Sequence, residues 1–208
     1  MNIFEPTVFL VDDDPAVRDS LSLFLSLKGF RIQPFASAED FLAIYQAQQP
    51  GCLVVDVQLG GMDGLSLQSE LHVKGINLPV IVMTAYGDVA TARVALKGGA
   101  IDFLEKPIDV ELLYKAVHEA LDRDRTSRIR ELEKTELQAH LALLSEREKQ
   151  VLSLMVEGKH NREIAAALGI SPRTVEVHKA RIMEKCRVPR LTDLLRIVLK
   201  NSLLHSSG

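Results

Sequence analysis

Three consecutive carboxylates follow a short apolar run near the start of the sequence. The run at 7–11 is followed directly by Asp12, Asp13 and Asp14. Carboxylates this close oppose one another's ionisation unless a cation lies among them. A helix N-cap explains Asp14, which stands just before Pro15, but it does not explain all three acids. We therefore expect Asp12 and Asp13 to hold a hard divalent cation such as Mg²⁺.

Three further polar residues stand at or just after the ends of other apolar runs: Asp56, Thr84 and Lys106. Each alone has an ordinary structural explanation. Together, a carboxylate, a hydroxyl, an ammonium group and a cation can hold a tetrahedral phosphoryl group, because its charge is neutralised and its oxygens accept hydrogen bonds. Asp56 is then the expected nucleophile, and the product is an aspartyl phosphate.

Residues 1–122 alternate short apolar runs with amphipathic segments. The expected strands are 7–11, 30–35, 52–56, 79–83 and 101–104, and the expected helices lie near 15–28, 37–47, 64–73, 88–98 and 109–122. This alternation predicts a doubly wound α/β domain, a five-stranded parallel sheet with helices on both faces. Ligands of such sheets bind beyond the carboxyl ends of the strands, where the polar residues above are placed.

The chain after residue 144 is predicted to be all helical. Its helices are expected at 145–158, 161–168, 171–187 and from about 191 onward. Ser145 and Glu148 form a capping-box pattern, and Ser171-Pro172 supplies an N-cap with a proline in the first turn. The tight turn LGISP between the second and third helices predicts a helix-turn-helix within 145–208.

Residues 109–144 contain neither Gly nor Pro and could form one long helix. The middle of this segment, DRDRTSRIRELEK, is highly charged. Its leucines do not keep a clean heptad: Leu132, Leu137, Leu141 and Leu144. We predict a solvated linker helix over 123–144, and a short dimerising coiled coil is the alternative.

The net charge of −3 hides an asymmetry along the chain. Residues 1–122 carry a net charge of −9, residues 123–144 carry +1 and residues 145–208 carry +5. An acidic first domain suggests a cation as its partner, and a basic tail suggests a polyanion. A length of 208 residues also favours two domains over one.

Nothing in the sequence predicts export or membrane insertion. The N-terminus lacks the basic start and long apolar run of a signal peptide. No stretch approaches the 18 or so uninterrupted apolar residues of a membrane span. Cys52 and Cys186 are far apart and in no metal-like spacing, so we predict reduced thiols. The protein is expected to be cytoplasmic.

The third helix of the tail has two different faces when projected at 100° per residue. Val175 and Ile182 lie on the face expected to pack inward. On the opposite face Val177 and Ala180 could meet thymine methyl groups, and Glu176 could accept a hydrogen bond from cytosine N4. Alternatively, these apolar residues lie on the exposed face by chance, since single exposed valines are common on protein surfaces. Basic residues in and near this helix are expected to contact DNA phosphates: Lys159, Arg162, Arg173, Lys179, Arg181 and Lys185.

Residues 5–122 resemble the receiver domain of bacterial response regulators, which has a flavodoxin-like fold. The matching motifs are FLVDDDPAVR, CLVVDVQLGGMDG, VIVMTAYGD and GAIDFLEKP. The resemblance implies that Asp12 and Asp13 form the acidic pocket, with Asp13 a direct Mg²⁺ ligand. It also implies that Asp56 is both phosphoacceptor and ligand, and that the backbone carbonyl of Gln58 is a ligand. Mn²⁺ could substitute for Mg²⁺.

The same resemblance assigns the residues that respond to phosphorylation. It implies that Thr84 is the switch hydroxyl, that Lys106 contacts the phosphate, and that Phe103 is the aromatic residue that changes rotamer. It also implies a cis peptide bond before Pro107.

Residues 145–199 resemble the LuxR-type, or NarL/FixJ-type, helix-turn-helix. The matching stretch is LSEREKQVLSLMVEGKHNREIAAALGISPRTVEVHKARIMEKC. The triplet Thr174-Val175-Glu176 stands where the family usually has Thr-Val-Lys, and the Glu-Val pair is closer to the FixJ branch. Thr174 is included among the expected DNA contacts. His160 stands where the family commonly has Ser or Thr, so the usual hydroxyl cap is missing there.

Together these resemblances imply a two-component response regulator of the FixJ/NarL family. A sensor histidine kinase would phosphorylate Asp56, and the face around residues 88–108 would then dimerise. The paired tails would bind promoter DNA, with RNA polymerase as a further partner. Beyond phosphoryl transfer to itself and loss of that group, no enzymatic activity is expected.

Two rival interpretations and one question stay open in the sequence. A Mg²⁺-dependent phosphatase with an aspartyl nucleophile would use the same residue types, but such enzymes usually carry an Asp-x-Asp pair on one strand. A DNA-binding protein whose receiver is never phosphorylated is the second rival, and the intact acceptor set argues against it. The unphosphorylated domains could contact each other or simply be tethered.

Overall fold

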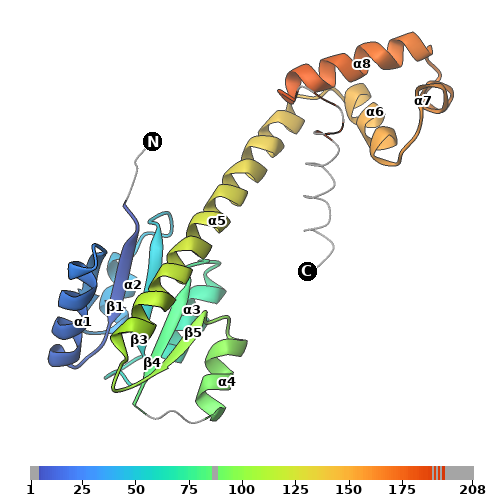
Figure 1. The fold of residues 1–208 in the computed structure, drawn as a ribbon. Helices are drawn as coiled ribbons and strands as arrows, with labels where there is room; N and C mark the ends of the chain where they lie inside the picture. The colour runs from blue at the N-terminus through green and yellow to red at the C-terminus, as the bar shows by residue number, and fades with distance from the viewer. Residues whose placement is uncertain (1–4, 86–88, 189, 191, 193, 195–208) are drawn as a thin grey trace. The chain divides into compact units, whose positions relative to one another are not determined.

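The structure, a computed structural model, describes residues 5–85 and 89–188 together with residues 190, 192 and 194 (Figure 1). The chain divides into two compact units, residues 1–128 and 129–208. The strands of the first unit are β1 Thr7–Val11, β2 Arg31–Phe35, β3 Gly51–Asp56, β4 Val80–Thr84 and β5 Asp102–Glu105. Its helices are α1 Pro15–Leu27, α2 Ala38–Ile44, α3 Gly64–Val73 and α4 Val89–Lys97, followed by α5, Val110–Ala142, which continues into the second unit.

The five strands form a parallel sheet in the order β2-β1-β3-β4-β5, which confirms the predicted doubly wound, flavodoxin-like fold. Strands β1, β3 and β4 are buried along their whole length, as their near-continuous apolar sequences require. Side chains of α2, α3 and α4 pack on one face of the sheet, and those of α1 and α5 pack on the other. The strand ends that carry the polar residues therefore lie along one edge of a rigid layer.

Helix α5 confirms the prediction of one long helix, but part of it is not solvated. Asp124 is only 3% exposed, and its carboxylate accepts hydrogen bonds from the backbone N–H of Gly51 at 3.0 Å and from Arg128 Nε at 2.7 and 2.9 Å. The Arg128 guanidinium also donates to the backbone carbonyls of Gln48 and Gln49, at 3.0 and 2.7 Å. We call this set of contacts the α5 latch. It binds α5 to the start of β3, beyond the predicted end of the receiver at residue 122.

Gly51 is needed where the latch meets the sheet. Its φ is +154°, and a Cβ atom there would lie 1.9 Å from the backbone oxygen of Thr7. A side chain at this position would push β3 away from β1. The close approach of the two strands leaves the Gly51 N–H directed at Asp124.

The second unit contains α6 Glu146–Val156, α7 Asn161–Leu168 and α8 Pro172–Lys185 around its own apolar core. The helix-turn-helix prediction is confirmed by α7, the turn after it and α8. The fourth helix predicted from about residue 191 lies almost wholly outside the described residues. Among the helices that the structure describes, none has the length and hydropathy that crossing a bilayer requires.

The helix starts of this unit follow the capping signals in the sequence. Ser145 Oγ accepts from the N–H of Glu148, and the Glu148 carboxylate accepts from the N–H of Ser145, so the predicted capping box is present. Ser171 Oγ accepts from Thr174 N–H at 3.1 Å. At α7, where the hydroxyl is missing, the Glu163 carboxylate accepts from the backbone N–H of His160 at 2.7 Å.

We predict that Arg128→Gln lowers the free energy of unfolding of the first unit by about 2 kcal/mol, because it leaves the buried Asp124 without its cation. Urea unfolding of the full chain measures the loss, and faster hydrogen exchange at residues 46–52 would localise it to the latch. Arg125→Gln, an exposed arginine one turn earlier on α5, is the matched control and should change stability by less than about 0.5 kcal/mol. Equal effects of the two substitutions would contradict a stabilising latch.

Candidate functional site

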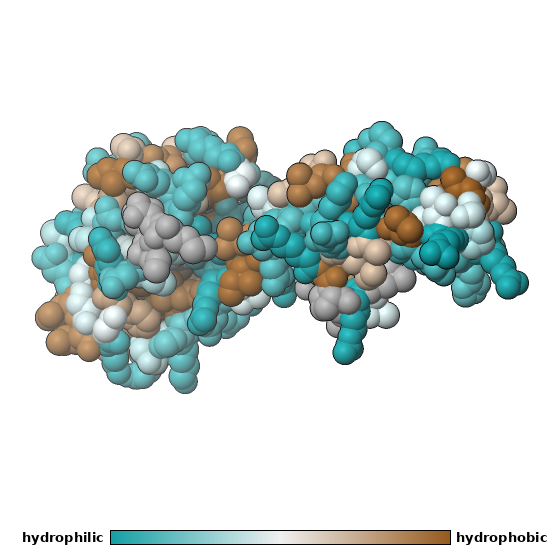
Figure 2. Space-filling view, turned by 90° about the horizontal axis from the view of Figure 1, so that it is seen from above, coloured by the Kyte–Doolittle hydropathy of each residue, from teal (hydrophilic) through white to brown (hydrophobic). Residues whose placement is uncertain are grey.

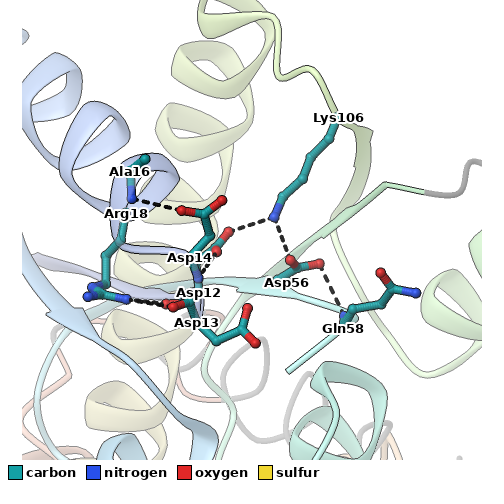
Figure 3. Close-up of polar contacts among 8 residues, drawn as sticks. All are labelled: Asp12, Asp13, Asp14, Ala16, Arg18, Asp56, Gln58 and Lys106. Atoms are coloured by element: carbon teal, nitrogen blue, oxygen red, sulfur yellow. Dashed lines mark hydrogen bonds and ion pairs between the residues drawn. The ribbon is translucent and has the colours of Figure 1, made fainter. Parts of the chain in front are cut away.

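Three strand ends bring a lysine and two buried carboxylates together at one edge of the sheet (Figure 3). Asp12 follows β1, Asp56 is the last residue of β3, and Lys106 follows β5. The ammonium group of Lys106 lies 2.8 Å from Asp12 Oδ2 and also donates to Asp56 Oδ2. Asp12 is 0% and Asp56 4% exposed, so this lysine pairs with two carboxylates that water barely reaches, and its single positive charge does not balance both of them.

The remaining oxygens of the two buried carboxylates accept hydrogen bonds from backbone groups. Asp14 N–H donates to Asp12 Oδ1 at 3.0 Å, and Gln58 N–H donates to Asp56 Oδ1 at 3.1 Å. Gly64, the first residue of α3, has no room for a side chain, since a Cβ there would lie 2.2 Å from the carbonyl oxygen of Asp56. The glycine therefore lets the start of α3 lie close against the backbone of Asp56.

Asp13 completes an acidic cluster with Asp12 and Asp56. One carboxylate oxygen from each of the three residues lies within 4.8 Å of the others, and Asp13 is the exposed member. Carboxylate oxygens are the ligands that Mg²⁺ prefers, and like charges held this close gain from a shared cation. The residues therefore fit the divalent cation that the sequence predicts.

Burial and pairing act in opposite directions on the charged groups of this site. Burial raises the pKa of Asp12 above its ordinary value, and the hydrogen bond and charge of Lys106 oppose that increase. Burial lowers the pKa of Lys106, but its hydrogen bonds to Asp12 and Asp56 and their charges outweigh burial and leave the pKa raised. The two carboxylates therefore favour the charged form of Lys106 at this edge of the sheet.

The structure separates the tasks of the three consecutive aspartates. Asp14 caps α1, because its Oδ1 accepts from Ala16 N–H at 2.8 Å, as predicted. Asp12 binds Lys106, and Asp13 is directed at the acidic cluster. Sequence reasoning missed Arg18, which donates from α1 to the backbone carbonyls of Asp12 and Asp13 (Figure 3).

The predicted switch residues lie on β4, which pairs with the strand that ends at Asp56, and on β5, which pairs with β4. Thr84 is the last residue of β4 and is buried, and its carbonyl accepts from the Lys106 N–H at 2.7 Å. Phe103 pairs with Val82 across β4 and β5, and its half-buried ring packs on the core beneath α2, α3 and α4. The peptide bond between Lys106 and Pro107 is cis, as the resemblance implied.

The candidate DNA-binding helix α8 has the two faces that its sequence predicts. Val175, Ile182 and Cys186 are buried in the core of the second unit, while Val177 is 44% exposed. The predicted DNA contacts that are exposed are Lys159, Arg162, Arg173, Glu176, Val177, Ala180 and Arg181, and those that are half-buried are Thr174 and Lys179. Figure 2 shows a mostly hydrophilic surface on the visible side of this unit.

Lys185 differs from the other predicted DNA contacts. Its ammonium group lies 2.7 Å from the Glu148 carboxylate and donates to the carbonyl of Leu143 at 3.1 Å. Glu148 is nearly inaccessible to solvent, and its pKa is lowered to about 2, first by the hydrogen bond from Lys185 and further by those from Ser145. This ion pair fastens the end of α8 to the start of α6, so the charge of Lys185 already has a structural partner.

Both units match families of known proteins. Residues 8–118 match the response regulator receiver domain, and residues 142–198 match the luxR family of bacterial regulatory proteins. The chain therefore belongs to the response regulators that join a receiver to a LuxR-type domain, and it is a DNA-binding transcription regulator of the two-component type. The predicted family is confirmed.

Particular relatives are similar to this chain over nearly their whole length. The transcriptional regulatory protein FixJ of Azorhizobium caulinodans is 43% identical over 92% of this chain and 91% of its own, and FixJ of Rhizobium meliloti is 42% identical over 93% and 95%. TdiR of Thauera aromatica is 41% identical over 94% and 86%. Among solved structures, the response regulator StyR is 38% identical with a TM-score of 0.83, and the similarity covers 94% of this chain and 99% of StyR.

We predict that the Glu148–Lys185 pair makes the second unit sensitive to acid. Because the folded pKa of Glu148, about 2, lies below the ordinary 4.5, its contribution to stability is complete above about pH 4.5 and is lost as the pH falls towards 2. Since Lys185 is partly exposed, we expect that contribution to be about 2 kcal/mol. Glu148→Gln should remove it at pH 7 and flatten the dependence on pH. Hydrogen exchange of α6 and α8, corrected for intrinsic rates, measures both effects.

Glu146→Gln is the control for this prediction, because Glu146 carries the same charge on the exposed surface of α6. It should leave the acid sensitivity in place. If Glu146→Gln and Glu148→Gln gave the same pH profile, the buried ion pair would not be the cause.

Proposed function

We propose that Asp56 accepts a phosphoryl group from a sensor histidine kinase and that the phosphorylated chain binds promoter DNA as a homodimer. The observation that carries this proposal is the convergence of Asp12, Asp13 and Asp56 within 4.8 Å, with Lys106 bridging two of them. A buried carboxylate with an adjacent fixed cation and an exposed acidic partner suits transfer of a phosphoryl group to the protein itself.

The proposed chemistry uses the residues at the strand ends. A carboxylate oxygen of Asp56 forms a bond to phosphorus while the bond from phosphorus to the imidazole nitrogen of the kinase breaks. Lys106 stays beside the phosphoryl oxygens, and the hydroxyl of Thr84 donates a hydrogen bond to one of them. Hydrolysis of the acyl phosphate by water later restores the free carboxylate.

A Mg²⁺ ion is part of this proposal, and Mn²⁺ could substitute for it. It would be held by the carboxylates of Asp12, Asp13 and Asp56 and by the backbone carbonyl of Gln58. When bound, it would neutralise charge on the phosphoryl oxygens during transfer.

The proposed response to phosphorylation passes through Thr84 and Phe103 to the face around residues 88–108. Helix α4, which belongs to this segment, has several exposed apolar side chains: Val89, Val94 and Leu96. Exposed apolar residues on one helix are suited to an interface between two copies of the chain. Dimerisation would then increase the affinity for DNA, because two linked DNA-binding units bind together. We propose that this takes place in the cytoplasm and that RNA polymerase is a further partner.

The DNA-binding surface that we propose is the predicted one without Lys185, whose charge is paired with Glu148. The residues proposed to contact phosphates are Lys159, Arg162, Arg173, Lys179 and Arg181. The residues proposed to meet base edges in the major groove are Thr174, Glu176, Val177 and Ala180.

Incubation of the full chain with acetyl phosphate and Mg²⁺ tests the acceptor. We expect intact-mass spectrometry to detect one phosphoryl group on the wild type and none on Asp56→Asn, and we expect the solution mass to rise towards that of a dimer. Asp63→Asn, which changes an exposed acid at the cap of α3, should still be phosphorylated. Steady release of phosphate from small esters, without a stable phosphoprotein, would instead favour a phosphatase.

The salt dependence of DNA binding tests the proposed phosphate contacts. Each lost contact should lower the slope of log affinity against log salt by about one, so we expect this for Arg173→Gln and for Arg181→Gln. Lys185→Gln should leave the slope nearly unchanged and lower stability instead. A slope unchanged by either arginine substitution would contradict α8 as the DNA-binding helix.

A further inference from the structure

Arg18 contacts the acidic cluster through backbone oxygens and not through carboxylates (Figure 3). It lies in the first turn of α1, and its Nη1 donates to the carbonyl of Asp12 at 2.7 Å and to that of Asp13 at 3.4 Å. These two carbonyls belong to the residues that follow β1. The side chain therefore fixes the path of the backbone through the two acids.

The three carboxylates of the cluster are not equally restrained. Each oxygen of Asp12 and of Asp56 accepts a hydrogen bond from Lys106 or from a backbone N–H. Within the described residues, no hydrogen bond or ion pair holds the carboxylate of Asp13. Its direction depends on the backbone of Asp13, and Arg18 is bonded to that backbone.

We infer that Arg18 is a positioning residue of the cation site. By holding the carbonyls of Asp12 and Asp13, it directs the Asp13 carboxylate towards the oxygens of Asp12 and Asp56, and it thereby sets the affinity for a divalent cation. This inference rests on the proposed function, in which the cluster binds Mg²⁺.

The charge of Arg18 and its hydrogen bonds affect cation affinity with opposite signs. A positive charge near the site repels the cation, so loss of that charge alone would tighten binding. Loss of an outer partner that orients a ligand weakens metal binding, typically ten- to hundredfold. Whether substitution of Arg18 raises or lowers the cation affinity therefore shows whether its charge or its hydrogen bonds have the larger effect.

Isothermal titration of the full chain with Mn²⁺ tests the inference. We expect Arg18→Gln to raise the Kd for Mn²⁺ about tenfold, because the Asp13 carboxylate is no longer held in its orientation towards Asp12 and Asp56. Arg18→Lys should raise it by a smaller factor, because an ammonium group keeps the charge but replaces the guanidinium that bridges both carbonyls. Thermal unfolding without cation checks that both variants are folded, and Arg18→Lys carries the test if Arg18→Gln is not.

Arg31→Gln is the matched control, since Arg31 is exposed and begins β2 at the opposite edge of the sheet. It removes the same charge from the same unit and should leave the Kd unchanged. Phosphorylation by acetyl phosphate supplies a second measurement. The Mg²⁺ concentration for half-maximal rate should rise in Arg18→Gln, while the rate at saturating Mg²⁺ stays that of the wild type.

An Arg18→Gln variant that binds Mn²⁺ as tightly as the wild type, or more tightly, would overturn the inference. A fall in the saturating phosphorylation rate without any change in Kd would also overturn it, because that is the behaviour of a merely structural residue. If the wild type itself binds no Mn²⁺, the proposed cation site fails and this inference fails with it. The two failures are therefore distinguished by the wild-type titration.

Discussion

The ion pairs of Lys106 with Asp12 and Asp56 are the interaction on which this site depends. They connect the ends of three strands, β1, β3 and β5, at a point where two carboxylates are almost completely buried. Without a cation there, the carboxylates would repel each other or take up protons. The lysine makes an acidic and buried strand edge compatible with a folded domain, and it leaves the exposed Asp13 on the side open to a divalent ion.

The same principle recurs at the other buried acids in the described part of the chain. Asp124 is paired with Arg128, and Glu148 is paired with Lys185. In each case the carboxylate also accepts a hydrogen bond from a backbone N–H, so a buried charge is satisfied by a cation and by the main chain together. One such group serves the proposed chemistry, one fixes a long helix to a sheet, and one fastens the ends of two helices.

Most of the fold could be predicted because it depends on local patterns. The strands follow from apolar runs, and their observed ends differ by about one residue from the predicted ones, as in β3, Gly51–Asp56. The caps at Ser145 and Ser171 follow from residue types at short spacing. Convergence of Asp12, Asp56 and Lys106 was predictable because parallel strands end at one edge.

The contacts that sequence reasoning missed join residues far apart in the chain or act on backbone groups. Arg128 donates to Gln48 and Gln49, about eighty residues away, and no periodicity marks such a pair. Lys185 has the composition of a DNA contact, and only its distance to Glu148 shows another use. Arg18 binds carbonyls, whose positions no residue type reveals.

The α5 latch has a consequence for anyone who recombines receivers with other output domains. A junction placed at residue 122, where the apolar pattern of the receiver ends, would discard Asp124 and Arg128 and leave the N–H of Gly51 buried without its acceptor. A junction placed after Arg128 would transfer the receiver together with the whole α5 latch. The transferable module is thus defined by a hydrogen bond at the start of β3, at the opposite end of the strand from Asp56.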